Sequence, residues 1–187
     1  MPLALSYLRV WDKEASYRVD EYVAISEFVR QRIKKYYERD AAVIHPAIDV
    51  SKYKISETQE DYFLMVGRLV AYKRFDLAVR AFAAMGLPLK IVGDGPEYGK
   101  IKNQISKVKN IEMLGLVSDY KLPDLYSHAK ALIFPQEEDF GIVPLEAHAC
   151  GAPVIGWGTS PKATIACMDK EERNRLKSAV GISPLRG

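Results

Sequence analysis

Short runs of apolar, strand-forming residues alternate with longer segments of helical spacing along most of this 187-residue chain. The short runs lie at residues 20–25, 42–45, 62–67, 89–93, 111–115, 131–135 and 153–156. The helical segments lie at residues 27–37, after a Ser26 N-cap, and at 75–85, 97–108, 122–128 and 143–150. Continuous apolar strands separated by helices are typical of a parallel sheet that is covered on both faces. The alternation therefore predicts an α/β fold with a doubly wound, Rossmann-like parallel sheet.

Two stretches interrupt this alternation. Residues 46–61 are polar and irregular, which predicts a linker or a domain crossing. After Gly158 the pattern stops, and the tail 158–187 has almost no apolar face with which it could pack. We therefore expect residues 62–157 to form the main domain and residues 1–45 to belong to another one.

Charge and cysteine content exclude several classes of protein. The chain carries 27 Lys and Arg against 24 Asp and Glu, and this near balance does not favour nucleic acid as a partner. The two cysteines, Cys150 and Cys167, do not have zinc-binding spacing, and they fit a reduced, cytoplasmic compartment. No apolar run approaches the length of about 18 residues that a membrane span needs, and no signal peptide is expected.

Basic residues follow the strand predicted at 62–67. Arg68 comes directly after it, and Lys73 follows five residues later. In a parallel α/β sheet, ligands bind beyond the carboxyl ends of the strands. A guanidinium that makes bidentate contacts and an ammonium that acts as a point charge are suited to a diphosphate. Taken alone these are ordinary surface charges, but their position at a strand end favours diphosphate binding.

The stretch EEDFGIVPLEAHACG, at residues 137–151, places two acids on either side of a glycine and a proline. Because Pro144 is tolerated only in the first turn of a helix, we expect a loop carrying Glu138 and a helix that starts near Val143 and carries Glu146. The free backbone N–H groups at that helix start, including those of Gly141 and Ile142, can receive an anion.

Other loops permit alternative interpretations. Residues 93–99, GDGPEYG, nearly match a dinucleotide-binding fingerprint, but the third glycine is one place late, so we favour a tight turn on the phosphate or sugar side. An NAD(P)-dependent oxidoreductase stays as the less favoured alternative.

Backbone groups at Leu116 and Val117 could bind a base edge, although a plain connection fits equally well. The acids at 137–139 have no nearby histidine or fourth carboxylate, and we expect no metal.

Several of these loops together resemble one known family. The segments GRLVAYKR (67–74), GDGPE (93–97) and ALIFPQEEDFGIVPLEAHACGAPVI (131–155) are similar to the retaining GT-B glycosyltransferases of family four. Glu138 and Glu146 match the E-x7-E motif of that family. The resemblance implies the C-terminal, nucleotide-sugar-binding half of a GT-B fold, preceded by the end of an N-terminal domain and the crossover.

The resemblance also implies a role for each matching residue. Arg68 and Lys73 would bind the diphosphate of the donor, and Glu138 would bind hydroxyls of the donor sugar; we predict these three as catalytic. Glu146 would bind the ribose. The amides near Gly141 and Ile142 would receive the distal phosphate. Because these groups stabilise the charge of the leaving nucleoside diphosphate, no metal and no cofactor beyond a GDP- or UDP-sugar substrate would be needed.

Activity and partners follow from the same resemblance. It implies transfer of a sugar with retention of configuration, with similarity to mannosyltransferase-like members that make surface polysaccharide. The acceptor is an unknown saccharide or lipid-linked saccharide, and peripheral membrane contact is permitted in the complete protein. We also expect a chain truncated at its N-terminus, with a reading frame that shifts near Gly158. The alternative is a non-catalytic, truncated nucleotide-binding remnant.

Overall fold

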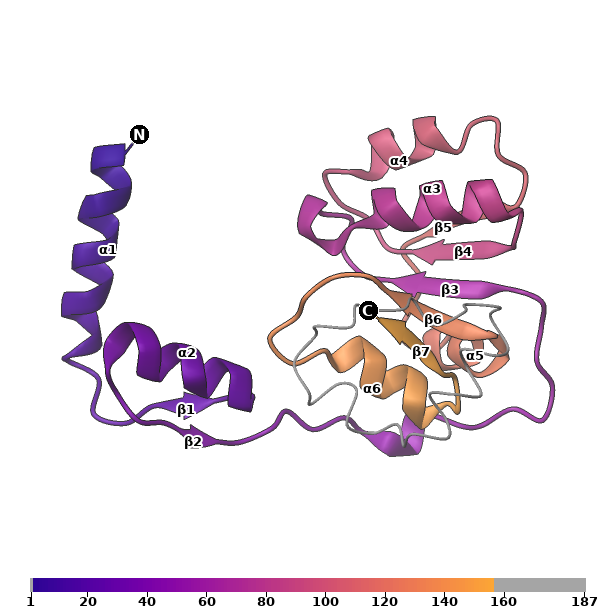
Figure 1. Ribbon diagram of the computed structural model, residues 1–187. Helices are drawn as coiled ribbons and strands as arrows, with labels where there is room; N and C mark the ends of the chain where they lie inside the picture. The colour runs from indigo at the N-terminus through magenta and orange to yellow at the C-terminus, as the bar shows by residue number, and fades with distance from the viewer. Residues whose placement is uncertain (1, 157–187) are drawn as a thin grey trace, which may run out of the picture. The chain divides into compact units, whose positions relative to one another are not determined.

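The computed structural model describes residues 2–156 (Figure 1). The chain divides into two compact units, Met1–Ala47 and the residues from Ile48 onward. The predicted tail at 158–187 and Cys167 lie outside the described residues.

The first unit contains two helices and a small parallel strand pair. Its elements are α1 (Pro2–Ser16), β1 (Val23–Ala24), α2 (Glu27–Tyr37) and β2 (Ala42–Val43), with β1 paired to β2. Helix α2 has the predicted bounds, and the Ser26 hydroxyl accepts a hydrogen bond from the Val29 N–H at 3.1 Å, as an N-cap does. The two strands are shorter than predicted, and helix α1 was not predicted.

The second unit is built on a five-stranded sheet in which every neighbouring pair is parallel. Its strands are β3 (Phe63–Val66), β4 (Leu89–Val92), β5 (Ile111–Gly115), β6 (Ala131–Phe134) and β7 (Val154–Gly156). The helical elements are η1 (Val50–Lys52), η2 (Ala71–Lys73), α3 (Phe75–Met85), α4 (Tyr98–Gln104), α5 (Leu122–His128) and α6 (Ile142–Ala149). This arrangement confirms the predicted α/β class with a doubly wound parallel sheet.

Helices cover both faces of the sheet, as the continuous apolar strands predict. Phe63 and Met65 of β3 belong to the core that includes α3 and α4. Leu64 and Val66 point to the opposite face, into a second core that includes α5 and α6. Successive residues of a strand alternate between faces, so β3 needs apolar residues at every position to be buried on both sides.

The order of the strands creates a crevice at a defined place. The sheet runs β5-β4-β3-β6-β7, so the chain moves outward from β3 to β5 and then returns to the other side of β3 as β6 (Figure 1). In such sheets the loops that follow the two strands on either side of this reversal separate at the carboxyl ends and leave room for a ligand. Here those loops follow β3 and β6, and they carry four of the eight predicted site residues, namely Arg68, Lys73, Glu138 and Gly141.

Two helices differ slightly from their predicted bounds. Helix α4 ends at Gln104 rather than at residue 108, because the N–H groups of Ser106 and Val108 bond to carbonyls only three residues back, which tightens the chain into turns. Helix α6 covers Ile142–Ala149, one residue earlier than predicted at each end.

Within residues 2–156, none of the helices is long and apolar enough to cross a bilayer.

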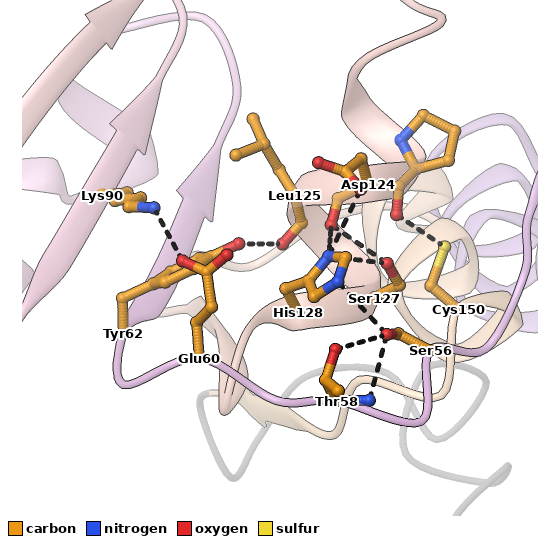
Figure 2. Close-up of polar contacts among 11 residues, drawn as sticks. Ser56, Thr58, Glu60, Tyr62, Lys90, Asp124, Leu125, Ser127, His128 and Cys150 are labelled. Carbon is orange, nitrogen blue, oxygen red and sulfur yellow. Dashed lines mark hydrogen bonds and ion pairs between the residues drawn. The ribbon is translucent and has the colours of Figure 1, made fainter.

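Residues 56–60 of the polar segment that follows Ile48 lie at the C-terminal end of α5. The Ser56 hydroxyl is 3.2 Å from Nε2 of His128 (Figure 2). The Glu60 N–H donates to the His128 carbonyl at 2.8 Å. Gln59 donates its side-chain amide to the Ala129 carbonyl at 3.4 Å. The part of the predicted linker that belongs to this unit is therefore held against the helix by hydrogen bonds.

Candidate functional site

A pocket of about 470 Å³ opens at the carboxyl ends of β3, β4 and β5. Gly67 and Arg68 line it from the loop after β3, Asp94 from the turn after β4, and Leu116 and Val117 from the loop after β5. Three predicted site residues, Arg68, Leu116 and Val117, therefore lie around one cavity. Arg68 and Leu116 are exposed, so they can meet a ligand without rearrangement of the core.

The glycines of the GDG turn permit close contact between two loops. A Cβ added at Gly93 would lie 1.9 Å from the Gly67 carbonyl oxygen, and one at Gly95 would lie 2.5 Å from the Leu69 carbonyl oxygen. The Leu69 N–H donates to the Asp94 carbonyl at 2.9 Å across the same contact. Both glycines also have positive φ, which other residues rarely adopt. The turn is thus a support for the loop that carries Arg68.

This geometry disfavours the oxidoreductase alternative. In a dinucleotide fingerprint, the third glycine permits close packing of the helix on the strand. Gly99 instead lies on the exposed side of α4, and a Cβ added there would meet no atom within 4 Å. The space at the first two glycines is filled by the backbone of the neighbouring loop. The tight-turn interpretation fits these contacts better.

An ion pair joins the loops after β3 and β6. The Lys73 ammonium, at the end of η2, lies 2.9 Å from Oε1 of Glu138, and the two side chains are only 15% and 23% exposed. A Cβ added at Gly67 would lie 3.4 Å from Cδ of Lys73, so this glycine leaves room for the lysine stem. Two predicted site residues from distant parts of the sequence are therefore in direct contact at the point where the strand order reverses.

Glu146, on α6, is bound by two tyrosines that were not predicted as site residues. Tyr53 donates its hydroxyl to Oε1 at 3.0 Å, and Tyr126 donates its hydroxyl to Oε2 at 2.9 Å. Tyr126 is 0% exposed and Tyr53 is partly buried. Burial and the nearby Glu146 raise the pKa of Tyr53 to about 12 and also raise the pKa of Tyr126. Both side chains are therefore neutral hydrogen-bond donors near neutral pH.

The remaining predicted residues lie at the start of α6. Gly141 precedes the helix with φ 89, and Ile142 is its first residue. Pro144 is buried in the first turn, where its missing N–H is not needed. Among residues 2–156 there is no group of three or more His, Cys, Asp or Glu that could hold a metal ion. The roles of the individual residues stay predictions.

A comparison with known families bears on this geometry. The model of the family described as Glycosyl transferases group 1 matches residues 47–172 of the chain. The chain belongs to this family. The match includes the loops after β3, β4, β5 and β6, and it confirms the resemblance drawn from the sequence. It also extends past Gly158, where we expected the family pattern to be lost.

Curated relatives in the Glycosyl transferases group 1 family are longer than this chain. It is 28% identical over 150 residues to an uncharacterized glycosyltransferase of Methanocaldococcus jannaschii, with 79% of this chain and 42% of the relative covered. It is 30% identical over 159 residues to the O-antigen chain mannosyltransferase of Salmonella typhimurium, with 80% and 45% covered. The chain therefore spans less than half the length of these two relatives.

Solved structures show the same fold. The crystal structure of Anabaena HepE in complex with UDP-glucose superposes with a TM-score of 0.73 at 18% identity. The superposition covers 92% of this chain and 57% of that one. It supports the assignment of this member of the Glycosyl transferases group 1 family to the GT-B architecture.

Proposed function

We propose that this chain supplies the donor-binding half of a retaining, metal-independent glycosyltransferase that uses a nucleoside diphosphate sugar. The observation that carries the proposal is the contact between Lys73 and Glu138 at the switch point of the sheet. It brings together a cation suited to a diphosphate and an acid suited to sugar hydroxyls. Such a pair is what the junction between the phosphate and the sugar of a donor requires.

The charges around this junction fit the chemistry of transfer. When the bond between sugar and phosphate breaks, negative charge accumulates on the leaving nucleoside diphosphate. Arg68 and Lys73 would stabilise that charge, together with the backbone N–H groups near Gly141 and Ile142 at the start of α6. Glu138 would hold the donor sugar and, as the family resemblance favours, would position it rather than attack it.

The base and the ribose would be bound by two other elements, the loop after β5 and helix α6. Backbone groups at Leu116 and Val117, at the far side of the pocket from β6, would bind the base. Glu146 would accept hydrogen bonds from the ribose. Base, ribose, diphosphate and sugar would thus each have a partner on a loop or helix at the carboxyl ends of the strands.

One comparison bears on the sugar that is transferred, and another bears on the nucleotide. The Salmonella relative is named a mannosyltransferase, and the Anabaena structure holds UDP-glucose. We therefore propose a GDP- or UDP-sugar as donor and a saccharide or lipid-linked saccharide as acceptor, in polysaccharide biosynthesis on the cytoplasmic side. Peripheral membrane contact is proposed only for the complete protein.

Donor binding provides the test of this proposal. Titration calorimetry of the full chain with UDP and with GDP, in the presence of EDTA, should show binding of at least one of them. Arg68→Ala should weaken that binding by about ten- to a hundred-fold, because a hydrogen bond to a charged group contributes roughly 1.5 to 3 kcal/mol. Arg80→Ala is the matched control, since Arg80 lies on α3 and pairs with Asp76 at 3.0 Å.

Each other outcome separates the alternatives. Absence of binding by a folded chain would leave the non-catalytic remnant, and tighter binding of NAD than of either nucleotide would support the oxidoreductase. Equal losses of nucleotide affinity in Arg68→Ala and Arg80→Ala would show that Arg68 does not contact the nucleotide. Binding that requires Mg²⁺ would contradict the metal-independent mechanism.

A further inference from the structure

The carboxylate of Glu146 is held on both sides by hydroxyl groups. Tyr126 contacts Oε2 from α5, and Tyr53 contacts Oε1 from the segment that follows η1. A glutamate on a helix surface would otherwise rotate freely about its last side-chain bond. With one donor fixed on each oxygen, the plane of this carboxylate is set by two separate elements.

Helix α5 provides a common reference for both tyrosines. Tyr126 is part of it and is fully buried. The segment that carries Tyr53 is held against the same helix by the contact of Ser56 with His128 (Figure 2) and by the hydrogen bond from the Glu60 N–H to the His128 carbonyl. Ile55 also lies close to the end of α6, since a Cβ added at Gly151 would be 3.2 Å from the Ile55 side chain. The two hydroxyls are therefore fixed relative to one another and to Glu146.

This arrangement leaves acceptor capacity unused. A carboxylate offers about four lone-pair positions, two on each oxygen. Tyr53 and Tyr126 each occupy one position, on different oxygens, so each oxygen of Glu146 retains one. A ribose presents two adjacent hydroxyls, which are donors of matching number and spacing for the two oxygens of one carboxylate.

We propose that Tyr126 and Tyr53 are positioning residues that hold the Glu146 carboxylate in the orientation required by the two ribose hydroxyls of the donor. The proposal rests on the proposed function, in which Glu146 binds the ribose. The tyrosines act through Glu146 and need not touch the donor. They would make the site selective for a ribonucleotide.

Discrimination between two nucleotides measures this role. The probes are UDP and 2′,3′-dideoxy-UDP, or GDP and 2′,3′-dideoxy-GDP if guanine is the base that binds. The full chain should prefer the ribonucleotide by about ten-fold or more, the effect of a charge-assisted hydrogen bond. Tyr126→Phe and Tyr53→Phe should each lower this ratio by about three-fold or more. Binding of the dideoxy nucleotide should stay the same, because it lacks the hydroxyls that Glu146 recognises.

The chain offers a matched control. Tyr62 is also buried, at 4% exposed, and its hydroxyl donates to the Leu125 carbonyl of α5 at 2.8 Å (Figure 2). Tyr62→Phe removes the same chemical group from the same part of the domain without touching Glu146. It should leave the ratio of the two affinities unchanged, whereas Glu146→Gln should reduce the ratio to near one.

The outcomes distinguish this inference from the proposed function. If neither UDP nor GDP binds, the proposed function fails and the inference fails with it. If Glu146→Gln abolishes the preference but both tyrosine variants keep it, the inference is wrong while the function stands. An equal loss in Tyr62→Phe would make the effect merely structural and would also overturn it. Should Tyr126→Phe fail to fold, the less buried Tyr53→Phe alone decides.

Discussion

The two acids of the E-x7-E motif are held in different ways. Glu138, on the loop after β6, is paired with the Lys73 ammonium at 2.9 Å. Glu146, on α6, accepts hydrogen bonds from two tyrosine hydroxyls at 3.0 and 2.9 Å. Both acids are partly buried, so each needs a partner to offset the cost of leaving water. One partner is a cation, and the others are neutral.

This difference suits the two acids to different parts of a donor. A cation beside Glu138 is also attractive to an incoming diphosphate, so the phosphate and Glu138 would compete for Lys73. The hydroxyls on Glu146 leave its charge in place, and a charged acceptor makes stronger hydrogen bonds with neutral donors. In the proposed function, the loop end of the motif would therefore meet the phosphate and the sugar, and the helix end would meet the ribose.

Removal of the cation should have the largest effect. Lys73→Met keeps much of the side-chain volume but removes the charge that the diphosphate would contact. It also leaves Glu138 partly buried without its cation and close to the bound phosphates. We expect the affinity for the nucleoside diphosphate to fall by about a hundred-fold or more, measured by titration calorimetry.

A second lysine tests whether this loss is specific. Lys90 is similarly shielded, at 26% exposed, and lies 3.5 Å from Glu60 at the opposite ends of the strands. Lys90→Met should change nucleotide affinity by less than about two-fold. Comparable losses in the two variants would mean that the ion pair after β3 has no special relation to the donor.

Neutral replacement should weaken nucleotide binding at one acid and not at the other. Glu138→Gln removes the anion that competes for Lys73, so UDP or GDP should bind as tightly as before or a few-fold more tightly. Glu146→Gln removes the charged acceptor that we propose for the ribose, so the same nucleotide should bind about ten-fold more weakly. Titration of both variants with the free nucleoside diphosphate, which lacks the sugar, isolates this contrast.

One outcome of these two titrations would contradict the expected difference between Glu138 and Glu146. If both variants lose affinity equally, the two ends of the motif are equivalent toward the nucleotide. The different partners of Glu138 and Glu146 would then have no bearing on recognition.

The sequence was sufficient to predict the sheet and the loops that surround the pocket. In a parallel sheet all carboxyl ends lie at one edge, so Arg68 and Lys73 could be placed at that edge from their position after a strand alone. Local signals also predicted the bounds of α2, which begins after the Ser26 cap. These features depend on periodicity and on capping, which are short-range properties of a chain.

These local signals do not predict contacts between segments that are distant in the sequence. Tyr53 and Glu146 are 93 residues apart, and a single tyrosine in a polar segment does not indicate what it will contact. Tyr126 has the spacing of an ordinary core residue on the apolar face of α5. The tyrosine contacts of Glu146 therefore follow only from the packing of distant segments, although the glutamate itself was identified from its motif.

Of the predicted effects, the smallest is a change in the free energy of unfolding at alkaline pH. It depends on the tyrosine partner of Glu146 and not on the cation beside Glu138. Burial and the hydrogen bond to Glu146 raise the pKa of Tyr53 from its ordinary value of 10.0 to about 12. The folded chain thus binds this proton more tightly than the unfolded chain does, and the associated stability is fully present below pH 10. It is lost as the pH rises from 10 to about 12, where ionised Tyr53 would face the Glu146 carboxylate.

Urea unfolding between pH 8 and pH 12 should show this decline in the free energy of unfolding, and Tyr53→Phe should make it shallower. Some decline should persist in that variant, because the pKa values of Tyr62 and Tyr126 are raised by burial as well. An identical slope in the two proteins would show that Tyr53 does not share its proton with Glu146 in solution, and the helix end of the motif would then depend on Tyr126 alone.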